Sequence, residues 1–171
     1  SNTTDPTKGD ALIGFRQSDA SGNLSGAIGR TVHQKLQEFV SVKDFGAVGD
    51  NFSDDTGAIQ AAITYVNSTT YGCGLYFPRG QYLISSTLSA FTKSVELFGD
   101  GWASIIKATG TSISAVFETN AGAAGSIFRD FAIYGSKNTT GGTIQRGIYF
   151  NGAKYCKAYN ILLSGPSSGT G

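Results

Sequence analysis

The spacing of apolar residues changes near Ser68, and this change organises the whole chain. Before it, residues 56–66 carry apolar side chains at helical spacing, which predicts an amphipathic helix. The buried face of that helix would consist of Ile59, Ala62, Ile63 and Val66. After it, short strand-like runs follow one another, separated by Gly, Ser, Thr and Asn: GLYF, YLIS, SVELFG, SIIKA, AVFET, IFRDFAIYG, RGIYF and YNILLSG. Such a succession indicates a β-sandwich, a β-barrel or a β-solenoid.

A weak internal repeat favours the solenoid. The stretch SIFRDFAIYGS (126–136) aligns with KYCKAYNILLS (154–164) without a gap, pairing Phe128 with Cys156, Phe131 with Tyr159 and Ile133 with Ile161. One coil of a solenoid takes about 20–30 residues, and the separation of the two stretches lies in this range. Because the first coil would leave its apolar interior and backbone open to water, it needs a cap with one apolar face. The helix over 56–66, directly before the strands, is predicted to be that cap.

The first 39 residues are predicted to form a leader and a neck, separate from a second part over 40–171. Residues 1–29 are rich in turn-forming residues and predict an extended leader that lies over another surface. Residues 30–39 place Val32, Leu36 and Phe39 on one narrow stripe, which predicts a short helix. So short a helix is marginal in isolation, and this stripe would therefore pack on its own domain or around a symmetry axis with copies of itself. A short strand is expected around Val40 and Val42.

Four aspartates stand between these parts, in DFGAVGDNFSDDTGAIQAAI (44–63). Asp54 or Asp55 is expected to accept N–H groups from the first turn of the following helix. Asp50 would accept a backbone N–H two residues on, and Asp44 would brace the same turn. The alternative is a pair of carboxylates for glycoside hydrolysis, about 5–10 Å apart. The structural interpretation is preferred, because caps and Asx turns are the common roles of aspartate at such positions.

Composition and charge argue against several classes of partner and ligand. The net charge is +1 and no run of Lys or Arg exists, which disfavours nucleic acid as a partner. No apolar run has the length of a membrane span. One histidine and two separated cysteines offer no recognisable metal motif, so no metal and no cofactor are expected. Cys73 and Cys156 are expected to be free thiols rather than a disulfide.

The central motifs resemble a known family. VSVKDFGAVGDNFSDDTGAIQAAI, GLYFPRGQYLIS and VELFGDG are similar to the start of the pectate-lyase-like right-handed parallel β-helix, and DPTKGDALIGFRQ with RTVHQKLQEFVSVKDFGA resembles the neck of bacteriophage tailspikes. The resemblance covers residues 5 to about 101. It implies a mainly β fold: a right-handed parallel β-helix, capped at its N-terminal end by a short α-helix and preceded by an extended leader and a neck helix.

The same resemblance implies a homotrimeric virion spike that binds a bacterial surface polysaccharide, such as capsule or O-antigen, and usually degrades it. It also implies assembly in the host cytoplasm, action outside the bacterial cell, and contacts with other phage tail proteins through the leader. Tailspike β-helices usually run longer than this chain, so a truncated form without the active site is expected. The catalytic residues of such spikes have no fixed motif, and none is assigned here.

Three residues are candidates for sugar contact. Trp102 is the only tryptophan and lies between turn residues, where its ring could stack on a sugar or serve packing. Arg129 and Arg146 are the best late cations for an anionic sugar, although exposed charges commonly form only local ion pairs. Three functions stay open: part of a polysaccharide-degrading spike, a structural trimerisation and attachment module, or a secreted pectate-lyase-like enzyme. The absence of a signal peptide at the start of this sequence counts against the third.

Overall fold

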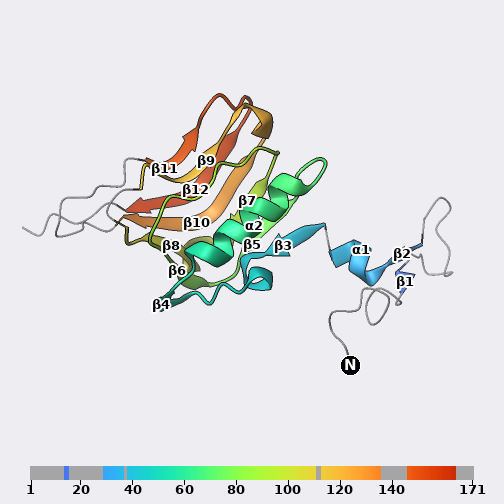
Figure 1. Ribbon diagram of the computed structural model, residues 1–171, viewed down its shortest axis with the longest axis horizontal. Coiled ribbons are helices and arrows are strands. Elements are labelled where there is room, and N and C mark those ends of the chain that lie inside the picture. Colours follow the sequence, from blue (N-terminus) through green and yellow to red (C-terminus); the bar gives the residue numbers. More distant parts are fainter. Residues whose placement is uncertain (1–13, 16–28, 37, 111–112, 136–145, 165–171) are drawn as a thin grey trace, which may run out of the picture. The chain divides into compact units, whose positions relative to one another are not determined.

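The computed structural model describes residues 14–15, 29–36, 38–110, 113–135 and 146–164 (Figure 1). The chain forms two compact units, residues 1–39 and residues 40–171. Within the described ranges, no helix has both the length and the apolar character that crossing a membrane requires. The same ranges hold no group of three or more His, Cys, Asp or Glu residues that could bind a metal ion.

The first unit contains short elements. Strand β1 (Gly14–Phe15) pairs antiparallel with β2 (Arg30–Thr31), and helix α1 (Val32–Leu36) follows at once. The helix expected over 30–39 is therefore too long, because residues 30–31 use their backbone groups to pair with β1 and residue 39 begins the next strand. The side chain of Leu36 is 58% exposed. Most of the expected leader over 1–29 lies outside the described residues.

The second unit is a parallel β-helix with three strand faces (Figure 1). The first face contains β3 (Phe39–Ser41), β5 (Gly74–Phe77), β7 (Glu96–Gly99) and the first parts of β10 (Ile127–Gly135) and β12 (Lys157–Ser164). The second face contains β4 (Asp50–Asp54), β6 (Gly80–Ile84), β8 (Ser104–Ala108) and the second parts of β10 and β12. The third face pairs β9 (Ala115–Thr119) with β11 (Arg146–Phe150). Short 3₁₀ helices lie in the connections: η2 (Val42–Phe45), η3 (Gly101–Ala103) and η4 (Ala121–Ala123).

Successive coils stack in parallel register, which confirms the solenoid and excludes the sandwich. On the first face Leu75, Leu97 and Phe128 occupy equivalent positions and are fully buried. On the second face Tyr82, Ile106 and Ile133 are likewise equivalent and buried. Phe117 of the third face packs against several other phenylalanine rings, Phe77, Phe91, Phe128 and Phe131. Each buried aromatic or aliphatic side chain of this kind contributes about 1.5–3 kcal/mol to folding, so the stacked interior stabilises the coil.

The predicted alignment of the internal repeat is wrong. Phe128 pairs with Ala158 instead of Cys156, and Phe131 pairs with Ile161 instead of Tyr159, so the true register between β10 and β12 is shifted by two positions. The expected equivalence of Ile133 and Ile161 fails for the same reason, since Ile133 pairs with Leu163. The separation from coil to coil also varies, because the step from Gly74 to Glu96 is much shorter than the step from Glu96 to Ile127. Turns of unequal length therefore hide the repeat in the sequence.

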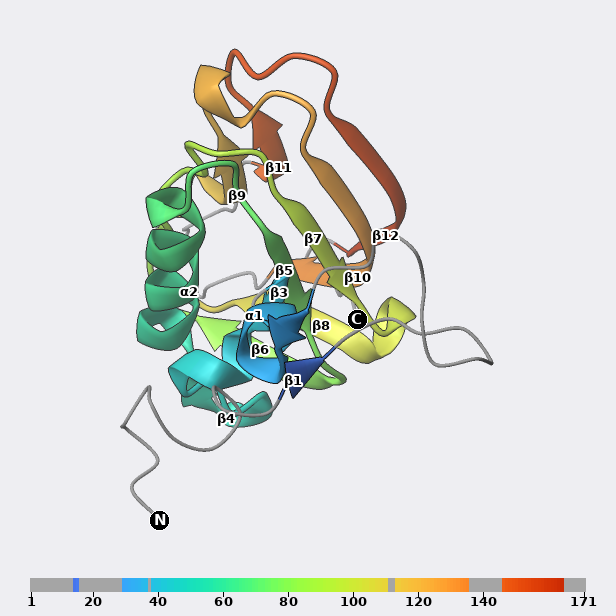
Figure 2. The ribbon, with the colours of Figure 1, turned by 90° about the vertical axis from the view of Figure 1, so that its right-hand side faces the viewer.

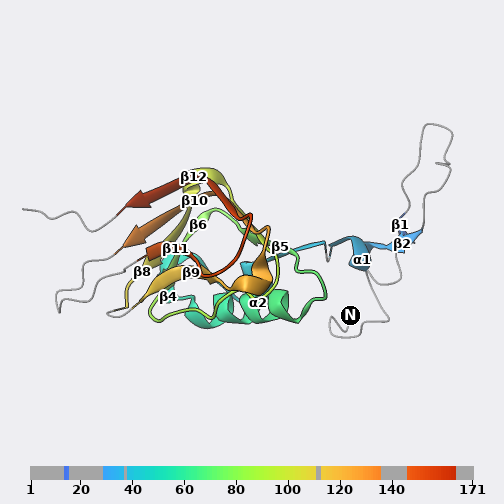
Figure 3. The same cartoon turned by 90° about the horizontal axis from the view of Figure 1, so that it is seen from above.

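Helix α2 (Thr56–Ser68) closes the first coil, as predicted. Its face of Ile59, Ala62, Ile63 and Val66 is fully buried in the core. Its amide side chains satisfy the open backbone edge of the coil: Gln60 Oε1 accepts from the N–H of Ser89 at 2.8 Å, and Asn67 bonds both Ala90 O and Thr92 N. Figures 2 and 3 show α2 and β12 on opposite sides of the coil. The helix thus takes the place of a third-face strand in the coil that contains β3 and β4, next to the segment around Phe91 that pairs with Thr119.

The aspartates have structural roles; Asp54 is the one of the expected pair that bonds the helix start, and Asp44 differs from expectation. Asp54 accepts from the N–H of Thr56 at 3.0 Å, and Asp50 accepts from the N–H groups of residues 52 and 53. Asp55 makes no helix cap; its carboxylate turns back and accepts from the N–H groups of residues 48 and 49 at 2.7 and 3.1 Å. Asp44 bonds the N–H of Ser41 and so caps η2 instead of bracing the turn at Asp50.

The segment after the neck differs in one further detail from the predicted strand around Val40 and Val42. Strand β3 covers residues 39–41, and Val42 begins the 3₁₀ helix η2, where its side chain is fully buried. The capping box at Ser41 starts that 3₁₀ turn and ends the strand. Cys73 and Cys156 are free thiols, as the sequence favoured.

Candidate functional site

The outward side chains of the first face form one continuous row across four coils. Tyr76 pairs in register with Phe98, Phe98 with Arg129, and Arg129 with Tyr159. Because parallel in-register strands lie about 4.8 Å apart, equivalent side chains stand directly above one another. We call these four residues the outer ladder.

The outer ladder combines aromatic faces with one guanidinium. The rings of Tyr76 and Phe98 are stacked, with centroids 5.1 Å apart and planes inclined by 22°. The guanidinium carbon of Arg129 lies 4.8 Å from the centroid of the Phe98 ring, within the range of a cation–π contact. Tyr159 completes the row and is 50% exposed. The row therefore presents partly exposed aromatic surface next to a fixed positive charge.

Two carboxylates hold Arg129 in place. Its Nε donates to Glu96 at 2.8 Å and its Nη1 donates to Asp130 at 2.6 Å. Asp130 also accepts from the Asn160 amide at 2.5 Å, and this bond, followed by the contact with Arg129, holds the pKa of Asp130 below its usual range. Asp130 and Asn160 both adopt positive φ, 61° and 51°, at the corner between the first two faces. The backbone at this corner thus holds the Asp130 carboxylate next to the Arg129 guanidinium of the outer ladder.

Trp102 lies on a turn next to this row. Asp100 accepts from the Tyr76 hydroxyl at 2.8 Å and from the N–H of Arg79 at 2.9 Å, and η3 follows directly. The Trp102 side chain is 59% exposed, and η3 lies against β10 and β12. The structure thus brings the tryptophan turn beside the strands that carry Arg129 and Tyr159.

Arg146 is separated from the other two candidates. It belongs to β11 on the third face, where its guanidinium carbon lies 4.3 Å from the ring centroid of Tyr149. This places the pair on a surface of its own.

The sequence did not predict that Tyr76, Phe98 and Tyr159 lie in one outward row. The alignment of the internal repeat matched Tyr159 with the inward Phe131, whereas its true partner is the outward Arg129. The alternation of apolar and polar residues marks the outward positions of each strand, but only the correct register shows that these positions lie above one another.

The outer ladder suits binding better than acid catalysis. Aromatic faces stack on the C–H faces of sugars, and charged side chains beside them can bond hydroxyl groups. A general acid in glycoside cleavage instead needs a carboxyl group with a raised pKa. Across the described ranges, the carboxyl groups with a shifted pKa, those of Glu38, Asp50, Asp54 and Asp130, all shift downward.

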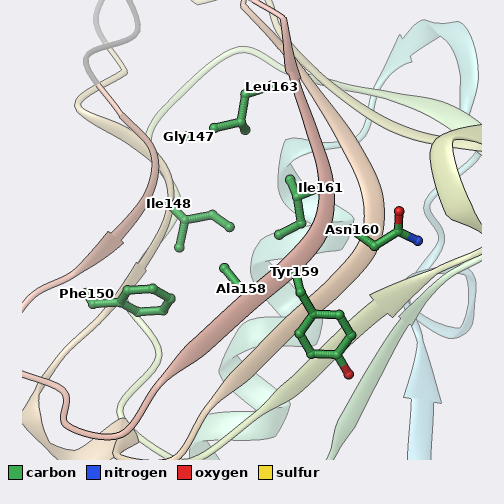
Figure 4. Close-up of a pocket in the computed structure, with 8 residues that line it drawn as sticks. All are labelled: Gly147, Ile148, Phe150, Ala158, Tyr159, Asn160, Ile161 and Leu163. Carbon is green, nitrogen blue, oxygen red and sulfur yellow. The ribbon is translucent and has the colours of Figure 1, made fainter.

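An apolar cavity of about 480 Å³ opens between β11 and β12 (Figure 4). In Figure 4 the side chains of Ile148, Phe150 and Ile161 point into the space between the two strands. These three residues also pack against the buried core of the coil. The cavity is therefore a continuation of the β-helix interior, with the chemistry of a core and not of a polar ligand site.

Comparisons with known proteins agree with this architecture. The family described as rhamnogalacturonase A/epimerase, pectate lyase-like, matches residues 39–146. The chain belongs to this family, and the parallel β-helix seen here agrees with its pectate lyase-like character.

Among individual proteins, the chain is 33% identical over 145 residues to the tail spike protein of Shigella phage Sf6, covering 80% of this chain and 22% of that protein. Tailspike protein 3 of bacteriophage CBA120 superimposes with a TM-score of 0.54 at 27% identity, covering 73% of this chain and 21% of that one. The A-module of mannuronan C-5 epimerase AlgE6 from Azotobacter vinelandii gives 0.56 at 26% identity, over 72% and 37%. The expected resemblance to phage tailspikes is confirmed, and the chain spans about a fifth of the Sf6 protein.

Proposed function

We propose that this chain is part of a phage tailspike that binds a bacterial surface polysaccharide, such as capsule or O-antigen, through the outer ladder. The similarity to the Sf6 tail spike over 80% of this chain supports the tailspike assignment. The stacked Tyr76, Phe98 and Arg129, with Tyr159 half-exposed at the end of the row, carry the binding assignment. A virion tail location follows from this assignment, with assembly in the host cytoplasm before release.

Trp102 and Arg129 take part in this proposal as sugar contacts, because η3 lies against the strands that carry Arg129 and Tyr159. Arg146 is proposed as a separate contact for a polysaccharide chain that extends around the coil. We assign degradation of the polysaccharide to a longer parent protein, and the leader to contacts with other tail proteins. A reducing-sugar assay on this chain with purified capsule and O-antigen tests the first assignment, because release of oligosaccharide would place catalysis within it.

The decisive experiment compares two tyrosines on this chain. Tyr159→Ala removes a ring from the outer ladder, whereas Tyr155→Ala removes a more exposed ring, 86% exposed, outside the ladder. Affinity for a panel of purified bacterial capsular and O-antigen polysaccharides is measured by affinity electrophoresis. Loss of one stacking ring should weaken binding of the recognised polysaccharide about tenfold, equivalent to about 1.4 kcal/mol. Tyr155→Ala should leave it unchanged, and equal effects of the two substitutions would contradict the proposal.

The second candidate function, a trimerisation module, is favoured by one observation. Leu36 exposes 58% of its side chain although it follows the apolar spacing predicted for an interface. An exposed leucine on a short helix can be covered by copies of the same helix around a threefold axis. We therefore propose that the neck contributes to a homotrimer, and that the binding and trimerisation roles coexist in one spike.

A further inference from the structure

A second groove lies at the corner where the first face turns into the second. It has a volume of about 350 Å³ and is lined by Gly49, Asp50, Asn51, Arg79, Gly80, Gln81, Ala103 and Ile105. These residues come from the starts of β4, β6 and β8 and from the turns before them, so three successive coils build one groove. None of them belongs to the outer ladder.

Bare backbone forms part of the groove wall. A Cβ atom on Gly80 would lie 2.8 Å from the carbonyl oxygen of Gly49, closer than real Cβ contacts permit. Gly49 itself adopts a φ of 69°, a conformation that side-chain-bearing residues rarely adopt. Glycine at both positions lets the two coils approach closely at the wall of the groove.

The polar side chains of Arg79 and Gln81 at the groove are available to bind a ligand. The backbone N–H of Arg79 donates to the Asp100 carboxylate, and the backbone N–H of Gln81 donates to Gly49 O. These bonds fix the main chain of Arg79 and of Gln81. In the described part of the chain, neither the Arg79 guanidinium nor the Gln81 carboxamide makes a side-chain hydrogen bond or ion pair. A guanidinium offers five donors in a planar fork that matches a carboxylate, sulfate or phosphate group.

The formal charges around the groove cancel, but the free hydrogen-bond donors favour an anion. Lys107 donates from Nζ to Asn51 Oδ1 at 3.3 Å, which leaves further ammonium protons for a ligand. Asp50 is the carboxylate on the lining, and it already accepts from the N–H groups of residues 52 and 53 and from the Ser53 hydroxyl. Asp100, behind Arg79, is occupied by Tyr76 and by the Arg79 N–H. Arg79 therefore offers free donors at the groove and Lys107 keeps free ammonium protons next to the lining residue Asn51, whereas the oxygens of Asp50 and Asp100 are already bonded.

We propose that this groove is a subsite for one sugar unit that carries an anionic group, with that group bound by Arg79 in the groove and by Lys107, which lies next to the lining residue Asn51. The apolar side chains of Ala103 and Ile105 would contact the C–H face of the sugar, while the Gln81 carboxamide bonds its hydroxyl groups. The volume lies at the lower end of the roughly 300–1,000 Å³ found for small-molecule sites, which suits a single sugar unit. This inference rests on the proposed function, since it names the chemistry of one part of the polysaccharide.

Monosaccharides test the groove without the outer ladder. The ¹⁵N-labelled chain is titrated with glucuronate, glucose 6-sulfate and glucose 6-phosphate, and with glucose as the neutral match. Saturable shifts of the amide signals of Gly49, Asn51, Gly80 and Gln81 are expected with at least one anionic sugar. Glucose should cause a response at least tenfold weaker. The three anionic sugars distinguish a carboxylate from a sulfate or a phosphate as the recognised group.

Matched variants complete the test. Arg79→Gln removes the groove guanidinium, and Lys154→Gln makes the same change of charge at an exposed lysine beyond β11. Arg79→Gln should abolish the saturable shifts, and Lys154→Gln should retain them. No saturable shift with any anionic sugar, an equal response to glucose, or an unchanged response in Arg79→Gln would each overturn the proposal. Failure here with a normal Tyr159→Ala result in the polysaccharide assay would leave the proposed function standing.

Discussion

At the scale of single residues, the sequence can predict that an aspartate binds backbone N–H groups and still not predict which N–H groups it binds. Asp54 and Asp55 are adjacent, and both could cap the helix that begins at Thr56. Asp54 bonds the helix start, whereas Asp55 is only 2% exposed and fastens the loop at residues 48 and 49. The sequence predicts a carboxylate that binds backbone N–H groups, but only the fold decides which N–H groups lie within reach.

Asp55 is expected to be important for stability. Asp55→Ala would leave the N–H groups of Val48 and Gly49 without their acceptor in a partly buried loop. Unsatisfied buried donors cost about 1–3 kcal/mol, so the free energy of unfolding should fall by that amount. Urea denaturation measures it. Asp55→Asn keeps one acceptor oxygen and should recover part of the loss, whereas an alanine variant as stable as the parent would contradict this role.

At the scale of elements, one helix replaces a strand of the first coil. The face of α2 supplies apolar side chains to the interior, and its Gln60 and Asn67 amides supply the hydrogen bonds that a neighbouring strand would give. Gln60 and Asn67 are separated by about two helical turns, so both reach the same edge. An amphipathic helix can therefore cover the open edge of the third face and satisfy its backbone groups.

The cap predicts a sharp contrast between two neighbouring faces of α2. Ile63→Asp would place an unpaired charge at a fully buried position, whereas Ala61→Asp places the same charge at an exposed one. The first should lower the free energy of unfolding by several kcal/mol, and the second by about 0.5 kcal/mol or less. Thermal unfolding followed by circular dichroism compares them. Similar midpoints for both variants would mean that α2 does not close the coil.

At the scale of the whole molecule, the question is how the chain associates. The proposed trimer would cover Leu36, and its side chain is the exposed apolar group on α1 that supports the proposal. Sedimentation equilibrium at micromolar concentration should give a mass near three times the 17.8 kDa of one chain. Leu36→Glu would place like charges together at the axis and should shift the equilibrium to the monomer. If the unsubstituted chain is a monomer, the neck alone does not drive assembly.

The elements of the second unit could largely be predicted from the sequence. Strands β5, β8, β9, β10 and β11 coincide with the strand-like runs, and the buried face of α2 follows its apolar spacing. Alternation of apolar and polar residues is local, because it reflects the two-residue period of a strand or the 3.6-residue period of a helix. The family motifs are also local, since each is a short continuous stretch of sequence, and they indicated the β-helix without knowledge of the tertiary structure.

The tertiary structure alone decided the register of the coils, and with it the candidate sites. Connections of unequal length set which residues stack, and the positive φ of Asp130 places Arg129 outward and Phe131 inward. Neither effect is visible in local spacing, since register depends on backbone pairing between residues that lie far apart in the sequence. The sequence by itself therefore determined which segments form the coil and its cap. The stacking of those segments determined which side chains meet in the outer ladder and in the groove at Arg79.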